Sequence, residues 1–199
     1  APQRLAVSVS PGMGPVLSVM EAWDTLRDKG PRRVLPTAVP ALMPNAPAAA
    51  VGIELGAHGG IHAPVSACAS GAEAIAYGAD LIALGRADVV VAGGTDAALH
   101  PMTVAAFAAM RALSTRNADP QTASRPFAPD RDGFVLGEGA GLLVLERAEH
   151  AKARGARILA VLAGSGVTAD AYDVARPEPS GAEQEQALRL ALERAGIDP

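Results

Sequence analysis

The sequence predicts a layered α/β fold, and three observations support this prediction. Short apolar segments bounded by glycine or proline alternate along the chain with longer segments of helical spacing. Ala87–Ala92 (ADVVVA) is apolar except for Asp88, as expected of a strand with helices on both faces. Hydrophobic residues make up 49% of the sequence but aromatic residues only 3%, so most apolar side chains are small. Such a pattern indicates closely packed helices around a sheet.

Strands are expected where apolar runs are bounded by turn-forming residues. They are Arg4–Ser10, Ala63–Ala67, Ala87–Ala92, Gly141–Glu146 and Ile158–Val167. Helices are expected where apolar residues recur every three or four positions. They are Val16–Lys29, Ala48–Leu55, Gly71–Leu84, Val104–Ala112, Ala148–Arg154 and Ala182–Ala195. Turn-forming residues and polar composition predict loops over the remaining stretches, among them the proline-rich residues 31–47 and the polar residues 114–133.

The last helix carries signals for both of its ends. Ser180 and Glu183 have the spacing of a capping box, which predicts that the serine side chain caps the helix. Gly196 follows the helical pattern and is expected to end it.

Composition and charge exclude several classes of protein. The net charge of −4 gives no general attraction to nucleic acid, and no apolar run reaches the roughly 18 residues of a membrane span. One cysteine forms neither an internal disulfide nor a cysteine-rich metal site. The glycine-rich stretch 133–141 lacks the spacing of a nucleotide fingerprint. We therefore expect a cytoplasmic protein that uses no metal and no cofactor.

Cys68 is the main candidate for chemistry. It lies in Pro64–Gly71 (PVSACASG), where an expected strand, a turn of small residues and an expected helix follow one another. This order places the thiol near a helix N-terminus, where free N–H groups favour a thiolate and stabilise an oxyanion. A buried structural cysteine is the alternative that the local sequence leaves open. The sequence context of the four histidines indicates no proton acceptor; they are His58, His62, His100 and His150.

Three further segments accompany Cys68 in a fixed order. The chain carries SACASG at 66–71, GGTD at 93–96, ALSTRNADP at 112–120 and ASRPFAPDRDGFVLGEGAG at 123–141. Together these segments strongly resemble the elongating β-ketoacyl-acyl-carrier-protein synthases of type II fatty acid synthesis, over essentially the whole chain. The resemblance implies a partial thiolase-like αβαβα fold. Residues 1–150, approximately, would belong to its N-terminal half, and residues 151–199 would begin its C-terminal half.

The resemblance also implies a reaction. Cys68 would take an acyl group from a carrier protein, and a malonyl carrier protein would lose carbon dioxide and attack that thioester. In the family, two histidines and a lysine in HGT and NSFGFGG motifs support this step, and neither motif occurs in these 199 residues. The isolated chain is therefore expected to be inactive in condensation.

Further site residues are implied by the same resemblance. Phe107 matches a gate beside the cysteine, Met13 matches the far end of the acyl pocket, and Asp170 and Pro177 lie in a loop like the family's second gating loop. Basic positions that would meet the acidic carrier protein are Arg32, Arg33 and Arg111. The family is homodimeric, and residues 42–45 would lie near the partner's site.

The charged residues of the long 123–141 segment are interpreted as structural, because side chains of alternating sign can pair and hold a loop in place. They are Arg125, Asp130, Arg131, Asp132 and Glu138. Within the gating loop, Asp173 and Ala175 stand where relatives carry a histidine and a hydroxyl residue, so its substrate contacts are not implied.

Three alternative functions remain. A ketosynthase of a type II polyketide synthase shares the same motifs. A thiolase shares the fold and the nucleophile, but its sequence differs in the region of residues 125–141. A non-catalytic chain-length partner usually lacks the cysteine, so Cys68 argues against it.

Overall fold

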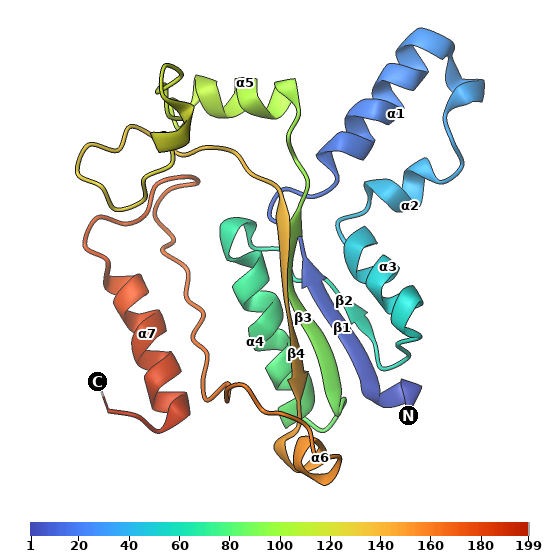
Figure 1. The fold of residues 1–199 in the computed structure, drawn as a ribbon, viewed down its shortest axis with the longest axis vertical. Coiled ribbons are helices and arrows are strands. Elements are labelled where there is room, and N and C mark those ends of the chain that lie inside the picture. Colours follow the sequence, from blue (N-terminus) through green and yellow to red (C-terminus); the bar gives the residue numbers. More distant parts are fainter. Residues whose placement is uncertain (199) are drawn as a thin grey trace.

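The computed structural model describes residues 1–198, in which four strands form one mixed sheet of order β2-β1-β3-β4 (Figure 1). The strands are β1 (Leu5–Ser10), β2 (Ile61–His62), β3 (Val89–Asp96) and β4 (Gly139–Glu146). β1 pairs in parallel with β2 and β3, and β4 pairs antiparallel with β3. Parallel neighbours require crossover connections, and helices supply them here.

Seven α-helices surround this sheet within the described residues. They are α1 (Val16–Lys29), α2 (Ala38–Leu42), α3 (Ala46–Leu55), α4 (Ser70–Ala83), α5 (Pro101–Ala109), α6 (Ala148–Ala153) and α7 (Ala182–Ala195). Short 3-10 helices add η1 (Pro2–Arg4), η2 (Pro31–Arg33), η3 (Ala67–Ala69) and η4 (Pro120–Thr122). None of the helices within residues 1–198 combines the length and apolar character that crossing a membrane requires.

The two faces of β1 are buried against different helices. Because side chains alternate along a strand, Ala6 faces α4 and packs in a cluster with Leu81 and Val90. Val7 and Val9 face the other way and pack against Ala48 of α3. Figure 1 shows α3 and α4 on opposite sides of the sheet. The predicted layered α/β arrangement is confirmed.

The expected strand at Ala63–Ala67 is wrong, because in this part of the chain the residues that pair with β1 are Ile61–His62. The register aligns Val7 with Ile61 and Ser8 with His62. Two residues further along is Pro64, which has no N–H to donate to the ladder. The chain leaves the sheet there, and Val65 is half exposed.

The long strand expected at Ile158–Val167 is also wrong. This segment forms no strand in the structure, since no neighbouring strand within residues 1–198 pairs with it. It runs beside α7 instead: a Cβ added to Gly166 would lie 1.9 Å from the Ala187 carbonyl oxygen. Leu159 and Val161 are more than four-fifths exposed. Apolar composition therefore predicted an extended segment but not its pairing.

Two local expectations need correction as well. Residues 31–47 are not an irregular loop throughout, because they contain η2, α2 and the start of α3. Pro31 and Pro47 are tolerated in η2 and α3 because each occupies the first turn of its helix. The predicted capping box of α7 is absent: Gly181 is the N-cap residue, and the Ser180 hydroxyl accepts from the Ala182 N–H at 3.3 Å.

A charged cluster joins the far end of β4 to α6. Glu146 is almost buried and binds both Arg154, at 2.6 Å, and His150. Hydrogen bonds from Arg154 and then from His150 lower the pKa of Glu146 to about 2, against an opposing effect of burial. The ordinary pKa of this group is 4.5. The folded protein therefore favours the ionised form of Glu146 over its protonated form more than the unfolded chain does.

Glu146→Gln is expected to lower the free energy of unfolding of the full-length protein at neutral pH by about 1–3 kcal/mol, because charge-assisted bonds are lost. The lowered pKa contributes stability that is present above about pH 4.5 and lost as the pH falls toward 2. Urea unfolding at several pH values should therefore show a weaker acid dependence in the variant. Glu149→Gln, at an exposed carboxylate in the first turn of α6, is the control. Equal acid dependence in all three proteins would contradict this prediction.

Candidate active site

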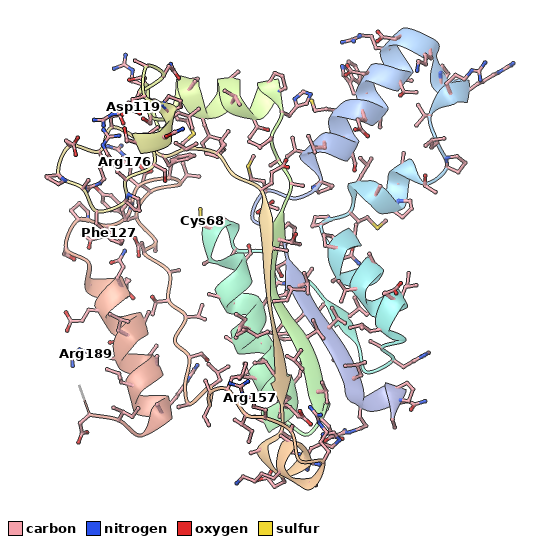
Figure 2. All side chains as sticks on the ribbon, in the orientation of Figure 1. Cys68, Asp119, Phe127, Arg157, Arg176 and Arg189 are labelled. Carbon is pink, nitrogen blue, oxygen red and sulfur yellow. The ribbon has the colours of Figure 1, made fainter. Side chains whose placement is uncertain are left out.

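Cys68 lies in η3, and this short helix leads directly into α4, which begins at Ser70. Ala67 has a φ of 51°, in the left-handed region that non-glycine residues rarely occupy, so the chain turns sharply just before the thiol. The Cys68 residue is exposed, and Figure 2 shows its sulfur projecting beyond the N-terminal end of α4. The predicted position near a helix N-terminus is confirmed, and a buried structural cysteine is not observed.

The buried hydroxyl of Ser70 braces this turn. Its Oγ accepts from the Ser66 N–H at 2.9 Å and donates to the Ala67 carbonyl oxygen at 2.6 Å. The Ser66 N–H precedes the strained Ala67, and the Ala67 carbonyl belongs to it. The Ser70 hydroxyl therefore bridges the turn that leads into Cys68. Such strain persists only where surrounding contacts over-determine the conformation.

Two glycines bring the start of α4 close to the sheet. A Cβ added to Gly94 of β3 would lie 3.0 Å from the Gly71 Cα, and the reverse addition would leave 3.2 Å. Any side chain at either position would push the helix away from the strand. The small residues of SACASG and GGTD therefore place the thiol at the carboxyl ends of β1 and β3, where ligands bind in open α/β sheets.

A hollow of about 280 Å³ opens beside Cys68. Its lining comes from the end of β1, the loop after it, the Cys68 turn and the adjoining ends of β3 and β4; these residues are Ser10, Gly12, Ala67, Cys68, Ser70, Gly71, Gly94, Thr95, Asp96 and Gly139. Most of these residues are small, so backbone atoms form much of the wall. An acyl group on the sulfur would have room along this surface.

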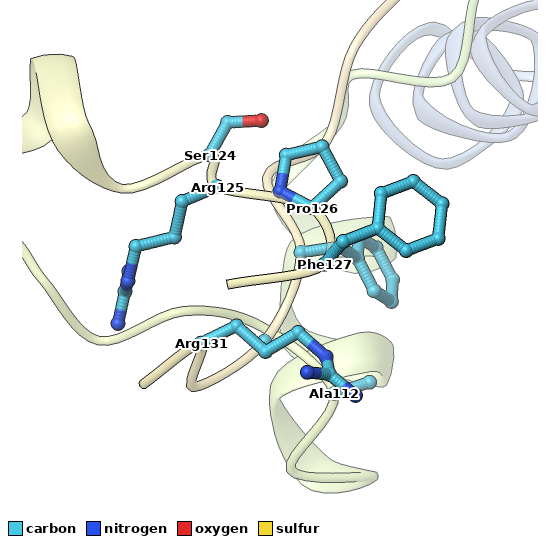
Figure 3. Close-up of a pocket in the computed structure, with 8 residues that line it drawn as sticks. Ala112, Ser124, Arg125, Pro126, Phe127 and Arg131 are labelled. Atoms are coloured by element: carbon cyan, nitrogen blue, oxygen red, sulfur yellow. The ribbon is translucent and has the colours of Figure 1, made fainter. Parts of the chain in front are cut away.

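A larger cavity of about 570 Å³ lies in the loop region that follows α5 and does not include Cys68 (Figure 3). Its residues are Ala112, Ser124, Arg125, Pro126, Phe127, Arg131, Gly133 and Phe134. In Figure 3 the guanidinium groups of Arg125 and Arg131 lie apart rather than converging on one point. We place the candidate active site at the smaller hollow because it contains Cys68, the predicted nucleophile.

Met13 and Phe107, predicted to shape the acyl site, lie in different surroundings. Met13 follows Gly12 of the hollow and is 47% exposed. Phe107 is a partly buried residue of α5 and packs edge to face against Phe134, with ring centroids 5.1 Å apart. The structure therefore brings Met13 close to the Cys68 hollow, whereas Phe107 is not among the residues that line it.

The predicted gating loop is held by its own carboxylates. Asp170 accepts from the Glu178 N–H at 2.8 Å and from the Gln184 amide, and Pro177 is exposed. Hydrogen bonds from the N–H groups of Ala175 and then Arg176 lower the pKa of Asp173. The structure thus orders the loop locally and does not bring it into the Cys68 hollow.

The three arginines expected to meet a carrier protein are exposed, but Arg111 lies apart from the other two. Arg32 and Arg33 lie in η2, beyond the end of α1, and Arg111 follows α5 with a φ of 56°. Figure 1 shows the η2 segment and the end of α5 on different sides of the molecule. A single compact basic patch is therefore not formed within the described chain.

The long polar loop is held by the ion pairs that its alternating charges indicated. Arg125 binds Asp130 at 3.3 Å and Asp132 at 3.1 Å, and Arg116 also binds Asp130. Hydrogen bonds from the Ser114 hydroxyl and the Thr115 N–H lower the pKa of Asp132. Two of the predicted residues use backbone partners instead. Arg131 donates to the Ala128 carbonyl oxygen, and Glu138 accepts from the Leu99 N–H.

No histidine within residues 1–198 lines the Cys68 hollow. His62 packs against Tyr77 with ring centroids 5.0 Å apart, and burial together with the Arg86 charge lowers its pKa. His100 caps α5 by accepting from the Met102 N–H at 3.1 Å. His150 binds Glu146 at the opposite end of the sheet. Within the described residues 1–198, Cys68 therefore has no imidazole beside it in the hollow.

Comparison with known families identifies the family of this chain. The model of the β-ketoacyl synthase N-terminal domain matches residues 2–151, and the model of the C-terminal domain matches residues 159–199. The chain belongs to the β-ketoacyl synthase family. Its fold agrees with solved β-ketoacyl synthases, which confirms the expected thiolase-like class. One of them, from Burkholderia phymatum STM815, is 38% identical with a TM-score of 0.87, over 98% of this chain and 47% of that one.

Curated β-ketoacyl synthases give a consistent result. The 3-oxoacyl-[acyl-carrier-protein] synthase 2 of Mycobacterium tuberculosis H37Rv is 46% identical over 98% of this chain and 47% of its own length. The enzyme of that name from Staphylococcus aureus is 46% identical over 98% of this chain and 48% of its own length. A ketosynthase solved with its type II polyketide acyl carrier protein is 33% identical with a TM-score of 0.87, over 100% of this chain and 50% of that one. The chain spans about half the length of the curated relatives it matches.

Sequence reasoning missed two residues of this β-ketoacyl synthase site, Ser70 as a brace and Asp96 as part of the hollow. Asp96 ends the GGTD segment, which contributed to the prediction only as part of the family resemblance. A polar residue at the end of a buried strand was the available signal.

Proposed function

We propose that the full-length protein is an elongating 3-oxoacyl-[acyl-carrier-protein] synthase. An acyl group passes from its carrier thiol to the Cys68 sulfur, and the carrier thiol leaves with the proton. Malonyl carrier protein then loses carbon dioxide, and the resulting carbanion attacks the thioester carbon. The new carbon–carbon bond forms as the carbon–sulfur bond breaks, which regenerates Cys68. The exposed thiol in the small-residue hollow at the start of α4 carries this proposal.

The same proposal assigns the decarboxylation to histidines outside these residues. This agrees with the finding that no histidine of residues 1–198 lines the hollow. We expect the isolated 199-residue chain to accept an acyl group at most, and not to condense it. We also propose the division of the chain near residue 150, supported by the separate matches to the two synthase domains.

Several roles extend the proposal to substrate and partners. Met13 and Phe107 would shape the acyl site, and Asp170 and Pro177 would lie at its entrance. Acyl and malonyl carrier proteins would be the partners; the basic residues proposed to meet them are Arg32, Arg33 and Arg111. A solved relative bound to its acyl carrier protein supports this class of partner. A cytoplasmic homodimer, with residues 42–45 near the partner's site, completes the proposal.

Fatty acid elongation is favoured over polyketide elongation by the shared name of the curated relatives. The structural likeness to a polyketide ketosynthase keeps the second pathway as the other candidate. Both use the same condensation, so they differ in the acyl chains accepted rather than in the role of Cys68.

The full-length protein should convert a saturated acyl carrier protein and malonyl carrier protein into a 3-oxoacyl carrier protein two carbons longer, with release of carbon dioxide. Mass spectrometry of the carrier-bound product measures this directly. Product from acyl coenzyme A but not from acyl carrier protein would overturn the proposal in favour of a thiolase. Product only when a second ketosynthase is supplied would overturn it in favour of a chain-length partner.

A further inference from the structure

The Asp96 carboxylate links the end of β3 to the loop between β1 and α1. Its Oδ2 accepts from the Gly12 N–H at 2.7 Å, and its Oδ1 accepts from the Met13 N–H at 3.2 Å. Each oxygen therefore holds one of two successive amides. This charge-assisted, two-point link joins residues more than 80 positions apart in the sequence.

The loop that Asp96 holds lies close to the turn at Ala67, which precedes Cys68. A Cβ added to Gly12 would lie 2.9 Å from Asp96 Oδ2 and 3.3 Å from the Ala67 carbonyl oxygen. Gly12 thus leaves no room for a side chain between the Ala67 carbonyl and the Asp96 carboxylate. The position of the loop relative to the thiol consequently depends on Asp96.

The hydrogen bonds argue against acid–base chemistry at Asp96. Both carboxylate oxygens face main-chain donors, so the group is engaged as an acceptor in a structural link. Asp96 nevertheless lines the same hollow as Cys68 and Gly12. What the carboxylate controls is therefore the shape of one wall of the hollow, through the Gly12–Met13 backbone.

We propose that Asp96 is a positioning residue that sets the acyl-chain length accepted by Cys68, by fixing where Met13 stands. This inference rests on the proposed function, because it requires an acyl group on the Cys68 sulfur. The half-exposed Met13 side chain follows directly after Gly12. Loss of the hydrogen bond to one of the two N–H groups lets Met13 move away from the hollow, and the hollow then accepts longer acyl chains.

Asp96→Asn tests the inference, because the amide side chain keeps one acceptor oxygen and loses the other. In the full-length protein, kcat/KM should be measured with carrier proteins bearing short, medium and long saturated chains. We expect the preference for the favoured chain over the next longer one to fall about tenfold. Asp80→Asn, at an exposed position of α4, should leave the preference unchanged.

A double variant distinguishes positioning from a general structural effect. If Asp96 acts through Met13, then Asp96→Asn should change the chain-length preference little further in a Met13→Ala background. An active Asp96→Asn variant with the wild-type preference, or full additivity with Met13→Ala, overturns the inference alone. Absence of product from the wild-type protein overturns the proposed function instead.

A second variant covers the case in which Asp96→Asn does not fold. Gly12→Ala places a methyl group against Asp96 Oδ2 and the Ala67 carbonyl oxygen, so the same loop must shift. It should change the chain-length preference, and an unchanged preference in this variant also overturns the inference. Thermal unfolding of each variant shows which of the two is the valid test.

Discussion

Cys68→Ala in the full-length protein is expected to lower the condensation rate about a thousandfold or more, because the proposed acyl acceptor is removed. The variant should also fail to gain the mass of an acyl group when incubated with acyl carrier protein. The physical basis is the exposed sulfur at the start of α4, in a hollow walled by small residues. Cys68 is the sole cysteine of these 199 residues, so a peptide from this part of the protein that carries an acyl group on cysteine can carry it only there.

The control for this experiment is Thr37→Ala. Thr37 is a small, exposed residue before α2, and its side chain makes no capping hydrogen bond. It should keep wild-type acyl loading and turnover. Thermal unfolding should be similar in both variants, since the Cys68 side chain is exposed. Undiminished condensation by Cys68→Ala would contradict the assignment of the nucleophile.

Gly93→Ala is expected to cost about 3 kcal/mol or more of folding stability, or to prevent folding. Gly93 lies in β3 with a φ of 152°, and an added Cβ would stand 2.1 Å from the Gly141 carbonyl oxygen of β4. That contact is with backbone, which cannot rotate aside as a side chain can. The strands would have to separate at the end of the sheet that carries the Cys68 hollow.

Gly137→Ala is the matched control for Gly93→Ala. An added Cβ at Gly137 meets no atom within 4 Å, and its φ is not in the left-handed region. Its free energy of unfolding in urea should stay close to that of the wild type, whereas Gly93→Ala should show a lower midpoint or little soluble protein. Equal stability of the two variants would show that β3 and β4 do not pack as described.

Elements with local signals were predicted closely. α1 and α7 have the predicted bounds, because apolar periodicity defines each helix and a glycine with positive φ follows it, Gly30 and Gly196 respectively. The position of Cys68 followed from the small-residue turn before α4. The strands at Ala63–Ala67 and Ile158–Val167 were wrong, because strand formation depends on a partner and the apolar pattern does not name one.

From the residues alone follow most of the helices, the position of Cys68 before α4 and the likeness to the β-ketoacyl synthases, because these depend on short-range patterns and motifs. The Asp96 link to Gly12 and Met13 could not be foreseen in this way, since it joins segments that meet only through the pairing of β1 with β3. The hollow beside Cys68 has the same origin. Its walls come from residues distant in sequence, so its shape exists only once the sheet and α4 have packed together.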